Sequence, residues 1–471
     1  MMSDFKSFIQ EQFLEISSTL HEPEMVRELR QKGKSLFDFQ GFPHNKLEKW
    51  RHKAIDLLLE PTETDKTHYA IQQKPLPYRP VEEFFTCDIQ DIGTTKYTFL
   101  NGWFVHDNQP LEISENGVIV GSILAAFEKY PELIQNHFAK FDLEKQDGFH
   151  SLNQALFTDG LFIYIPDNVI VEQPLQIVSV VDDYSKIIVQ HRHLVIVGKN
   201  SSLAVVHCDD SIHEEKSLIN NILEADIAEN GQLHYYKMEN KDAHTFLINH
   251  TFINQKRDSR FVSNMITFNS GYVRNEIQVN LNEPGADAKL YGLYLVDKKQ
   301  YVDNQVSVFH NAPDCTSNQI YKGIADDEAG ANFNGHIVVQ KDAQHTVAFQ
   351  VNKNIALTDE AKITTRPFLE IYADDVKCSH GATVGQLDEN AMFYIRSRGI
   401  CQRNARMLLM YAFANEVANF VLIDKLRERL NDMIKRRLQG ELTICDQCML
   451  HCSDEKNFTF EIDETQLKRS K

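Results

Sequence analysis

A run of cysteines near the end of the chain has the spacing of a metal site. Cys445 and Cys448 form a C-x-x-C pair, and Cys452 follows with His451 directly before it. Three thiolates and one imidazole can close a tetrahedral zinc site or hold an iron–sulfur cluster. The same residues also fit a set of reduced free thiols, or a segment that takes up metal adventitiously. Metal binding and free thiols are therefore the two interpretations of this spacing.

A second candidate site consists of a cysteine and a histidine separated by one residue, Cys378 and His380. On a β-strand, residues i and i+2 point to the same face, so both side chains can reach one ligand. A thiolate and a neutral imidazole together suit iron. The structural alternative is a small buried cysteine and a histidine that is satisfied by a backbone carbonyl.

The tripeptide Gly33-Lys34-Ser35 has the form of the end of a phosphate-binding loop. Such a loop requires another glycine five residues before its last glycine, and this chain has Glu28 there. The sequence therefore predicts that this chain binds no ATP itself.

Pairs of adjacent aspartates could suggest a carbohydrate-cleaving site, because glycosidases use two carboxylates. The pairs are Asp209-Asp210, Asp326-Asp327 and Asp374-Asp375. Adjacent residues on a strand point to opposite faces, which separates the two carboxylates of each pair. We therefore expect these residues at turns or rims, and we expect no enzymatic activity.

Composition and charge exclude several classes of protein. The chain has 471 residues, of which 42% are hydrophobic and 25% charged, as is ordinary for a globular protein. Its net charge of −18 argues against nucleic-acid binding, because phosphate contacts need a basic surface. No stretch reaches the roughly 18 apolar residues of a membrane span, and the first residues lack the pattern of a signal peptide. We therefore expect a cytoplasmic protein with reduced thiols and no membrane contact.

The hydrophobic pattern divides the chain into three regions. Residues 1–150 mix helical periodicity with β-rich segments, such as residues 97–105 around an Asn-Gly turn. Residues 151–387 contain short β runs between Asn, Asp, Gly and Pro, which is typical of a sandwich, a barrel or a β-solenoid. No repeat is legible by letter, so periodicity alone does not select the solenoid. Residues 388–471 are helical again, and Asp388 can cap the first of these helices.

The helix expected at residues 425–438 is strongly basic, although the protein as a whole is acidic. In one interpretation, these basic side chains form an ordinary solvent-exposed face of the helix. It can also be a docking surface for an acidic partner, since complementary charge steers association.

The stretch from Cys378 to Ile400 carries a resemblance to a known family. It begins Cys-Ser-His-Gly-Ala-Thr-Val-Gly, and residues 409–416 extend the match. This sequence is similar to the C-terminal signature of the SufB/SufD family of iron–sulfur cluster assembly proteins. Weaker matches, among them residues 48–50 and 152–155, spread over nearly the whole chain. SufB-type chains resemble a Cys-Glu-His-Gly-Ala-Thr version of the motif, whereas this chain has Ser379, which places the resemblance in the SufD branch.

The resemblance implies a mainly β fold with helical ends. Its core would be a right-handed parallel β-helix, between an N-terminal α/β domain and a C-terminal helical domain. It implies a non-enzymatic scaffold subunit that pairs with a SufB-type protein and docks a SufC-type ATPase. A transient iron–sulfur cluster would form at the SufB interface, with His380 at the site. Cys378 would join it there if both residues share one face of a strand, as argued above. The residues expected to dock the ATPase are Tyr394, Arg396, Arg398, Phe413 and Glu416.

Two further possibilities stay open. An independent metal or iron–sulfur carrier would use Cys445, Cys448 and Cys452 with His451, as their spacing suggests. The β-helix pairing that the resemblance implies suggests a homodimer when the partner is absent, because self-association would cover an exposed edge strand.

Overall fold

The computed structural model describes most of the chain up to residue 439. The described residues are 2–20, 22–51, 69–78, 80, 89, 92–106, 109–182, 186–212, 216–241 and 243–439. The predicted metal site at Cys445, Cys448, His451 and Cys452 lies outside them, so its function stays a prediction.

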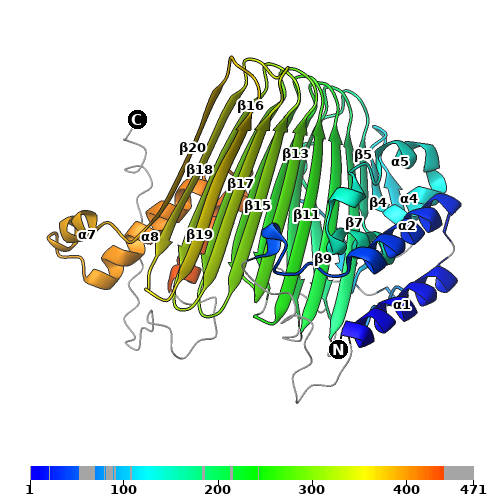
Figure 1. Cartoon of the computed structure of the whole chain (residues 1–471), viewed down its shortest axis with the longest axis horizontal. Helices are drawn as coiled ribbons and strands as arrows, with labels where there is room; N and C mark the ends of the chain where they lie inside the picture. Colours follow the sequence, from blue (N-terminus) through cyan, green and yellow to red (C-terminus); the bar gives the residue numbers. More distant parts are fainter. Residues whose placement is uncertain are drawn as a thin grey trace.

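The centre of the molecule is a stack of parallel strands in two sheets, between which the chain alternates (Figure 1). The first sheet contains β1 (Thr95–Leu100), β6 (Leu175–Val181), β8 (Ser202–Ser211), β10 (Gln232–Asn240), β12 (Arg260–Asn269), β14 (Asp287–Val296), β16 (Thr316–Ala325), β18 (Val347–Ala356) and β20 (Lys377–Gly385). The second contains β5 (Leu161–Ile165), β7 (Ile187–Val197), β9 (Ser217–Ile227), β11 (Thr245–Gln255), β13 (Tyr272–Leu281), β15 (Tyr301–His310), β17 (Gly330–Val339) and β19 (Lys362–Ile371). Because each turn of the chain adds one strand to each sheet, the fold is a parallel β-helix, and the fold implied by the resemblance is confirmed.

Successive turns of the β-helix pair in register. Tyr272 lies beside Tyr301, and Tyr301 lies beside Gly330. Side chains that are hydrogen-bonded between neighbouring turns lie 26 to 34 residues apart in the sequence. A repeat of variable length and free composition leaves no visible letter pattern. The structure therefore selects the solenoid among the three β architectures that the sequence allowed.

The inner faces of the two sheets pack against each other, and glycines make room there for large rings. In the register of β14 with β16, Gly292 is opposite Tyr321 and Tyr294 is opposite Gly323. A Cβ atom at Gly323 would lie 1.9 Å from Cε2 of Tyr294, and one at Gly292 would lie 2.2 Å from the Tyr321 ring. Each tyrosine ring thus occupies the space that a side chain on the neighbouring strand would need.

N-terminal helices cover the outer face of the second sheet (Figure 1). They are α1 (Met2–Thr19), α2 (Glu24–Gln40) and α6 (Gly148–Leu156). Ile9 and Phe13 of α1 and Leu152 of α6 are buried together with Ile188 and Ile248 of the sheet. Gly33 and Lys34 lie inside α2, so the tripeptide that resembles the end of a phosphate-binding loop is part of a helix. A Cβ at Gly33 would be 2.8 Å from the Ala155 nitrogen, which shows how closely α2 packs against α6 there.

The part of the chain before residue 151 also contributes strands to both sheets. The predicted Asn-Gly turn is confirmed: Asn101 and Gly102 have positive φ and join β1 to β2 (Trp103–Phe104) in an antiparallel hairpin. The other elements formed by the described residues of this part are η1 (Glu48–Trp50), β3 (Leu111–Ile113), β4 (Ile119–Ser122), α4 (Ile123–Lys129), α5 (Pro131–His137) and η3 (Leu143–Lys145). β3 and β4 extend the second sheet by antiparallel pairing. The division of the chain at residues 150 and 387 stays a prediction.

C-terminal helices pack on the outer face of the first sheet. They are α8 (Gln402–Ala418) and α9 (Asp424–Gln439); α7 (Glu389–Arg396) precedes them and contains no buried residue. The predicted cap is confirmed, since the Asp388 carboxylate accepts hydrogen bonds from Asn390 N and Ala391 N. In the basic helix α9, Arg437 is buried and donates to Asp297 at 2.7 Å, so part of the basic charge anchors the helix. No helix in the described part of the chain is long and apolar enough to cross a membrane.

Replacing Gly323 with alanine should lower the free energy of unfolding by about 1–3 kcal/mol, because the methyl group would overlap the Tyr294 ring in a packed interior. Gly381→Ala on β20 is the matched control, since nothing lies within 4 Å of its Cβ position. Urea unfolding of both variants measures the difference. Equal stability of the two variants would contradict this packing.

Candidate functional site at the open end of the β-helix

The last turn of the β-helix leaves two strands with a neighbour on one side only. Among the described residues, β20 pairs with β18 alone and β19 pairs with β17 alone. At the opposite end, the antiparallel strands β2 and β3 finish the sheets, and helices α4 and α5 lie close by (Figure 1). Every residue of β20 except Cys378 is exposed. We call β19 and β20 the open end; it presents an accessible strand edge.

Large apolar side chains are exposed around the open end. They are Phe349, Phe368, Ile371, Tyr372 and Val384. Their exposed fractions lie between 40% and 59%. Apolar side chains gathered at an unpaired strand edge are typical of a surface that binds another protein.

Cys378 and His380 lie on β20 and point to the same side of the strand. In the register with β18, Cys378 is opposite Ala348 and His380 is opposite Gln350, and both of these neighbours are buried in the interior. The predicted pair therefore faces the inner side of the last turn. His380 is exposed, whereas Cys378 is half-buried, and burial raises the pKa of its thiol. The imidazole is accessible to a ligand, and the thiol needs a metal or a base to become a thiolate.

The predicted docking residues near α7 are on the surface. Tyr394 is 60% exposed, and the Arg398 guanidinium lies 3.6 Å from the centroid of its ring. Arg396 is exposed too, and α7 contains no buried residue. These side chains are accessible to a partner, and their role in docking stays a prediction.

The predicted docking residues on α8 contact the β-helix as well as solvent. Lys322 of β16 is 4% exposed, and its ammonium lies 4.4 Å from the centroid of the Phe413 ring. The same ammonium forms an ion pair with Glu416 and donates to the Phe413 carbonyl at 3.1 Å. Phe413 and Glu416 thus fix α8 to the first sheet, whatever else they bind.

Sequence reasoning missed a belt of charged and polar side chains inside the β-helix. It is formed by inward-facing pairs at i and i+2, namely His191 and His193, His207 and Asp209, and Lys237 and Glu239. All of them are 4% exposed or less. The His207 Nε2 lies 3.2 Å from Lys237 Nζ, and its Nδ1 lies 2.9 Å from the Tyr235 hydroxyl. Polar residues at alternate positions of apolar strands are the signal that could have revealed this belt.

An asparagine ladder continues the belt along the second sheet. Its members are Asn221, Asn249, Asn275 and Asn304, hydrogen-bonded in sequence at 2.9–3.3 Å. The Glu239 carboxylate accepts hydrogen bonds from Asn249 at 2.7 Å and from Asn275 at 3.1 Å. Burial raises the pKa of Glu239 to about 7. The polar groups of the interior therefore bind mainly one another across successive turns.

The expectation that all the aspartate pairs lie at turns or rims is wrong for Asp209. Its side chain faces the interior and forms an ion pair with Lys237. Burial opposes ionisation there, but the Lys237 ammonium outweighs it and holds the pKa of Asp209 well below its usual range. Asp327 and Asp374 do lie in turns or bends, as expected. The sequence rule failed because it did not consider a cationic partner inside the β-helix.

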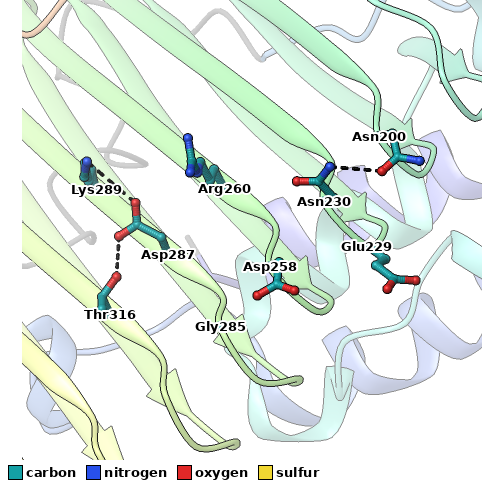
Figure 2. A pocket seen from close by; sticks show the side chains of 9 residues that line it. All are labelled: Asn200, Glu229, Asn230, Asp258, Arg260, Gly285, Asp287, Lys289 and Thr316. Atoms are coloured by element: carbon teal, nitrogen blue, oxygen red, sulfur yellow. Dashed lines mark hydrogen bonds and ion pairs between the residues drawn. The ribbon is translucent and has the colours of Figure 1, made fainter.

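A polar pocket of about 860 Å³ lies along the turns at one edge of the β-helix (Figure 2). It is lined by Asn200, Glu229, Asn230, Asp258, Arg260, Gly285, Asp287, Lys289 and Thr316. Asn230 donates to Asn200 at 2.9 Å, and Thr316 donates to Asp287 at 2.5 Å. Asn200, Asn230 and Asp258 have positive φ, which marks turn positions. These side chains bind one another from turn to turn, so we interpret the pocket as part of the turn scaffold.

Two family models together match most of the chain. Residues 3–177 match the SufBD protein N-terminal region, and residues 180–413 match the SUF system FeS cluster assembly SufBD core domain. The chain belongs to the SufBD family. The SufBD core match spans the β-helix from β7 to β20, and thus includes the open end, together with α7 and most of α8.

Relatives from three bacteria agree with this assignment. An iron–sulfur cluster assembly SufBD family protein of Synechocystis sp. is 29% identical over 433 residues, which covers 87% of this chain and 90% of that protein. SufD of Bacillus subtilis is 25% identical over 354 residues, 75% of this chain and 81% of that protein. SufD of Escherichia coli is 31% identical over 252 residues, 53% of this chain and 59% of that protein. The SufD relatives fit the branch that Ser379 indicated.

The interior belt predicts a pH dependence of stability. Burial and the Lys237 ammonium lower the pKa of His207 to about 4, from 6.5 in an ordinary histidine. The folded state therefore resists protonation, so this stability is present above pH 6.5 and is lost as the pH falls toward 4. As the pH falls from 6.5 to about 5, the free energy of unfolding of His207→Gln should therefore decrease less than that of the parent. The difference should be about 1.4 kcal/mol per pH unit. Urea unfolding at several pH values measures it.

The exposed His44→Gln is the control and should follow the parent at each pH. Glu239, whose raised pKa acts in the opposite direction, is present in all three proteins and cancels in the comparison. A His207→Gln variant with the parent's pH dependence would show that His207 is not held neutral in the interior.

Proposed function

We propose that this chain is a cytoplasmic, non-enzymatic scaffold subunit of a SUF iron–sulfur cluster assembly complex. The observation that carries the proposal is the unpaired edge of β20, which holds Cys378 and His380 at the open end. Membership of the SufBD family supports a role in cluster assembly. The partners we infer are a SufB-type protein at the open end and a SufC-type ATPase at the C-terminal helices.

The backbone of β20 supports pairing with a second strand. The Lys377 amide donates to the Thr346 carbonyl at 2.8 Å, and the hydrogen bonds of a parallel strand alternate between its two sides. The amides of Cys378, His380 and Ala382 therefore point away from β18. A SufB-type protein that presents its own edge strand would satisfy these amides and bury the apolar side chains around the open end.

Cys378 and His380 would then lie at the subunit interface, next to ligands supplied by the partner. A thiolate and an imidazole are ligands of iron–sulfur clusters, but two side chains do not complete a cluster's coordination. Because burial raises the pKa of the Cys378 thiol, iron must displace a proton to bind it. Both points favour a transient cluster that is shared with the SufB-type protein and then passed on.

The exposed surface of α7 supports docking of a SufC-type ATPase. Tyr394, Arg396 and Arg398 are accessible there. α8 follows α7 and is fixed to the β-helix through the ion pair of Lys322 with Glu416. Movement of an ATPase bound at α7 would therefore act on the first sheet, whose last strand is β20.

Two alternatives differ in the surface they need. When the partner is absent, the chain would pair with itself through the open end and form a homodimer. An independent metal or iron–sulfur carrier would instead depend on Cys445, Cys448 and Cys452, and would not require the open end.

Co-expression with a SufB-type protein and a SufC-type ATPase from the same genome tests the proposal, with size-exclusion chromatography and light scattering as the readout. The parent chain should elute with both partners. Ala382→Pro should bind the SufB-type protein at least tenfold more weakly, because proline removes an amide that faces the edge. Ala382→Ser is the matched control and should bind as the parent does. His380→Ala should keep the complex but hold less iron and acid-labile sulfide.

Three results separate the parts of the proposal. If the parent elutes alone while the other two proteins associate, the scaffold function is wrong. If Ala382→Pro binds the SufB-type protein as tightly as the parent does, the proposed pairing through β20 is wrong. If the complex with His380→Ala contains as much iron and sulfide as the parent complex, His380 has no role in cluster assembly. The proposed scaffold function would not be affected by that result.

A further inference from the structure

A group of side chains of the types that bind metals lies far along the sheet from the open end, between α6 and the outer face of the second sheet. Asp147, His150 and His250 each offer one ligand atom, and these atoms lie within 4.8 Å of one another. The rings of His150 and His250 have centroids 3.6 Å apart. Glu276 on β13 is directly opposite His250 on β11 in the register of the two strands.

Two imidazole nitrogens in this group face one carboxylate oxygen. Glu276 Oε2 lies 3.9 Å from His150 Nε2 and 3.5 Å from His250 Nδ1. Both histidines are 1% exposed, and neither nitrogen has a hydrogen-bond partner among the described residues. A buried polar atom without a hydrogen-bond partner is destabilising, so two such nitrogens beside one carboxylate oxygen call for a ligand.

Asp147 orients His150 for such a ligand. The Asp147 Oδ1 lies 2.9 Å from His150 Nδ1, and its Oδ2 accepts a hydrogen bond from Trp50 Nε1 at 2.8 Å. A carboxylate that holds one nitrogen of an imidazole leaves the other nitrogen free, as is usual for histidines that bind metals. In His150 the free nitrogen is Nε2, which lies 3.9 Å from Glu276 Oε2.

Arg274 orients Glu276 in a similar way. Its Nε donates to Glu276 Oε1 at 2.9 Å, and its Nη2 contacts the same oxygen. The guanidinium is held over the Trp50 ring, 3.8 Å from the ring centroid. Because Arg274 takes Oε1, the oxygen that remains for a ligand is Oε2, the one that faces both histidines.

We propose that His150 Nε2, His250 Nδ1 and Glu276 Oε2 bind a divalent first-row transition-metal cation. Ligands about 2.1 Å from a zinc-like ion in tetrahedral geometry are about 3.4 Å from one another. The distances from Glu276 Oε2 to the two histidine nitrogens, 3.5 and 3.9 Å, are close to this value. Two imidazoles and one carboxylate suit zinc, iron or manganese better than calcium or magnesium. Asp147 and Arg274 are positioning residues, since each acts through a ligand.

Glu276 connects this group of side chains to the surface. Pockets of about 330 and 470 Å³ are both lined by Glu276, which gives an ion a path from solvent.

Zinc binding to the full chain with Cys445, Cys448 and Cys452 replaced by serine tests this site apart from the predicted cysteine site. After chelator treatment, calorimetric titration should give one Zn²⁺ per chain, and zinc should raise the temperature of thermal unfolding. Glu276→Gln and His250→Gln should each weaken zinc binding at least tenfold. Co²⁺ in place of zinc should give d–d absorption without thiolate charge transfer, which excludes Cys378 as the ligand.

His336→Gln is the matched control, because His336 also pairs with a carboxylate on the outer face of the second sheet, Glu370, at 3.0 Å. It should bind zinc as the parent does. Absence of zinc binding in the serine-substituted chain would overturn the site. So would equal affinity of Glu276→Gln and His336→Gln, or a cobalt spectrum dominated by thiolate. Glu276→Gln preserves the shape of the side chain, which keeps the test valid if His250→Gln does not fold.

Discussion

Hydrogen bonding between successive turns is the interaction on which the rest of this structure depends. Each strand satisfies its backbone amides and carbonyls by lying in register against the strands of the turns before and after it. At the N-terminal end, antiparallel strands and helices finish the stack. At the C-terminal end, β19 and β20 have no such neighbour among the described residues. The interaction that builds the core therefore also creates the surface through which a second protein can extend it.

The polar belt explains why the turns stack in one register only. A shift of one residue would turn Asp209 and Lys237 out of the interior and place their apolar neighbours inside, separating the ion pair. Asn249 and Asn275 add hydrogen bonds that exist only when the turns are aligned. A stack specified in this way is a rigid platform, which suits the proposed scaffold function of presenting Cys378 and His380 in a fixed position.

Features that depend on neighbouring residues in the sequence could be predicted, whereas features that depend on distant residues could not. The Asp388 cap was predictable from its own residue type, and the shared face of Cys378 and His380 from strand alternation. The β-helix followed from resemblance alone, because its turns vary in length and share no letters. The contact of His150 with Glu276 was beyond sequence reasoning, since it joins a helix to a strand more than a hundred residues later. The register of β11 with β13 places Glu276 beside His250, and the packing of α6 on the second sheet brings His150 to them.

Hydrogen exchange of β20, with and without a SufB-type protein, tests the central claim most directly. The account predicts slowed exchange at the amides of Cys378, His380 and Ala382 in the complex, because these amides face the open edge. The amides of Lys377 and the strands of the β-helix interior should exchange at the same rate in both states. A stable complex in which β20 exchanges as fast as in the isolated chain would contradict the account, because the partner would then bind elsewhere.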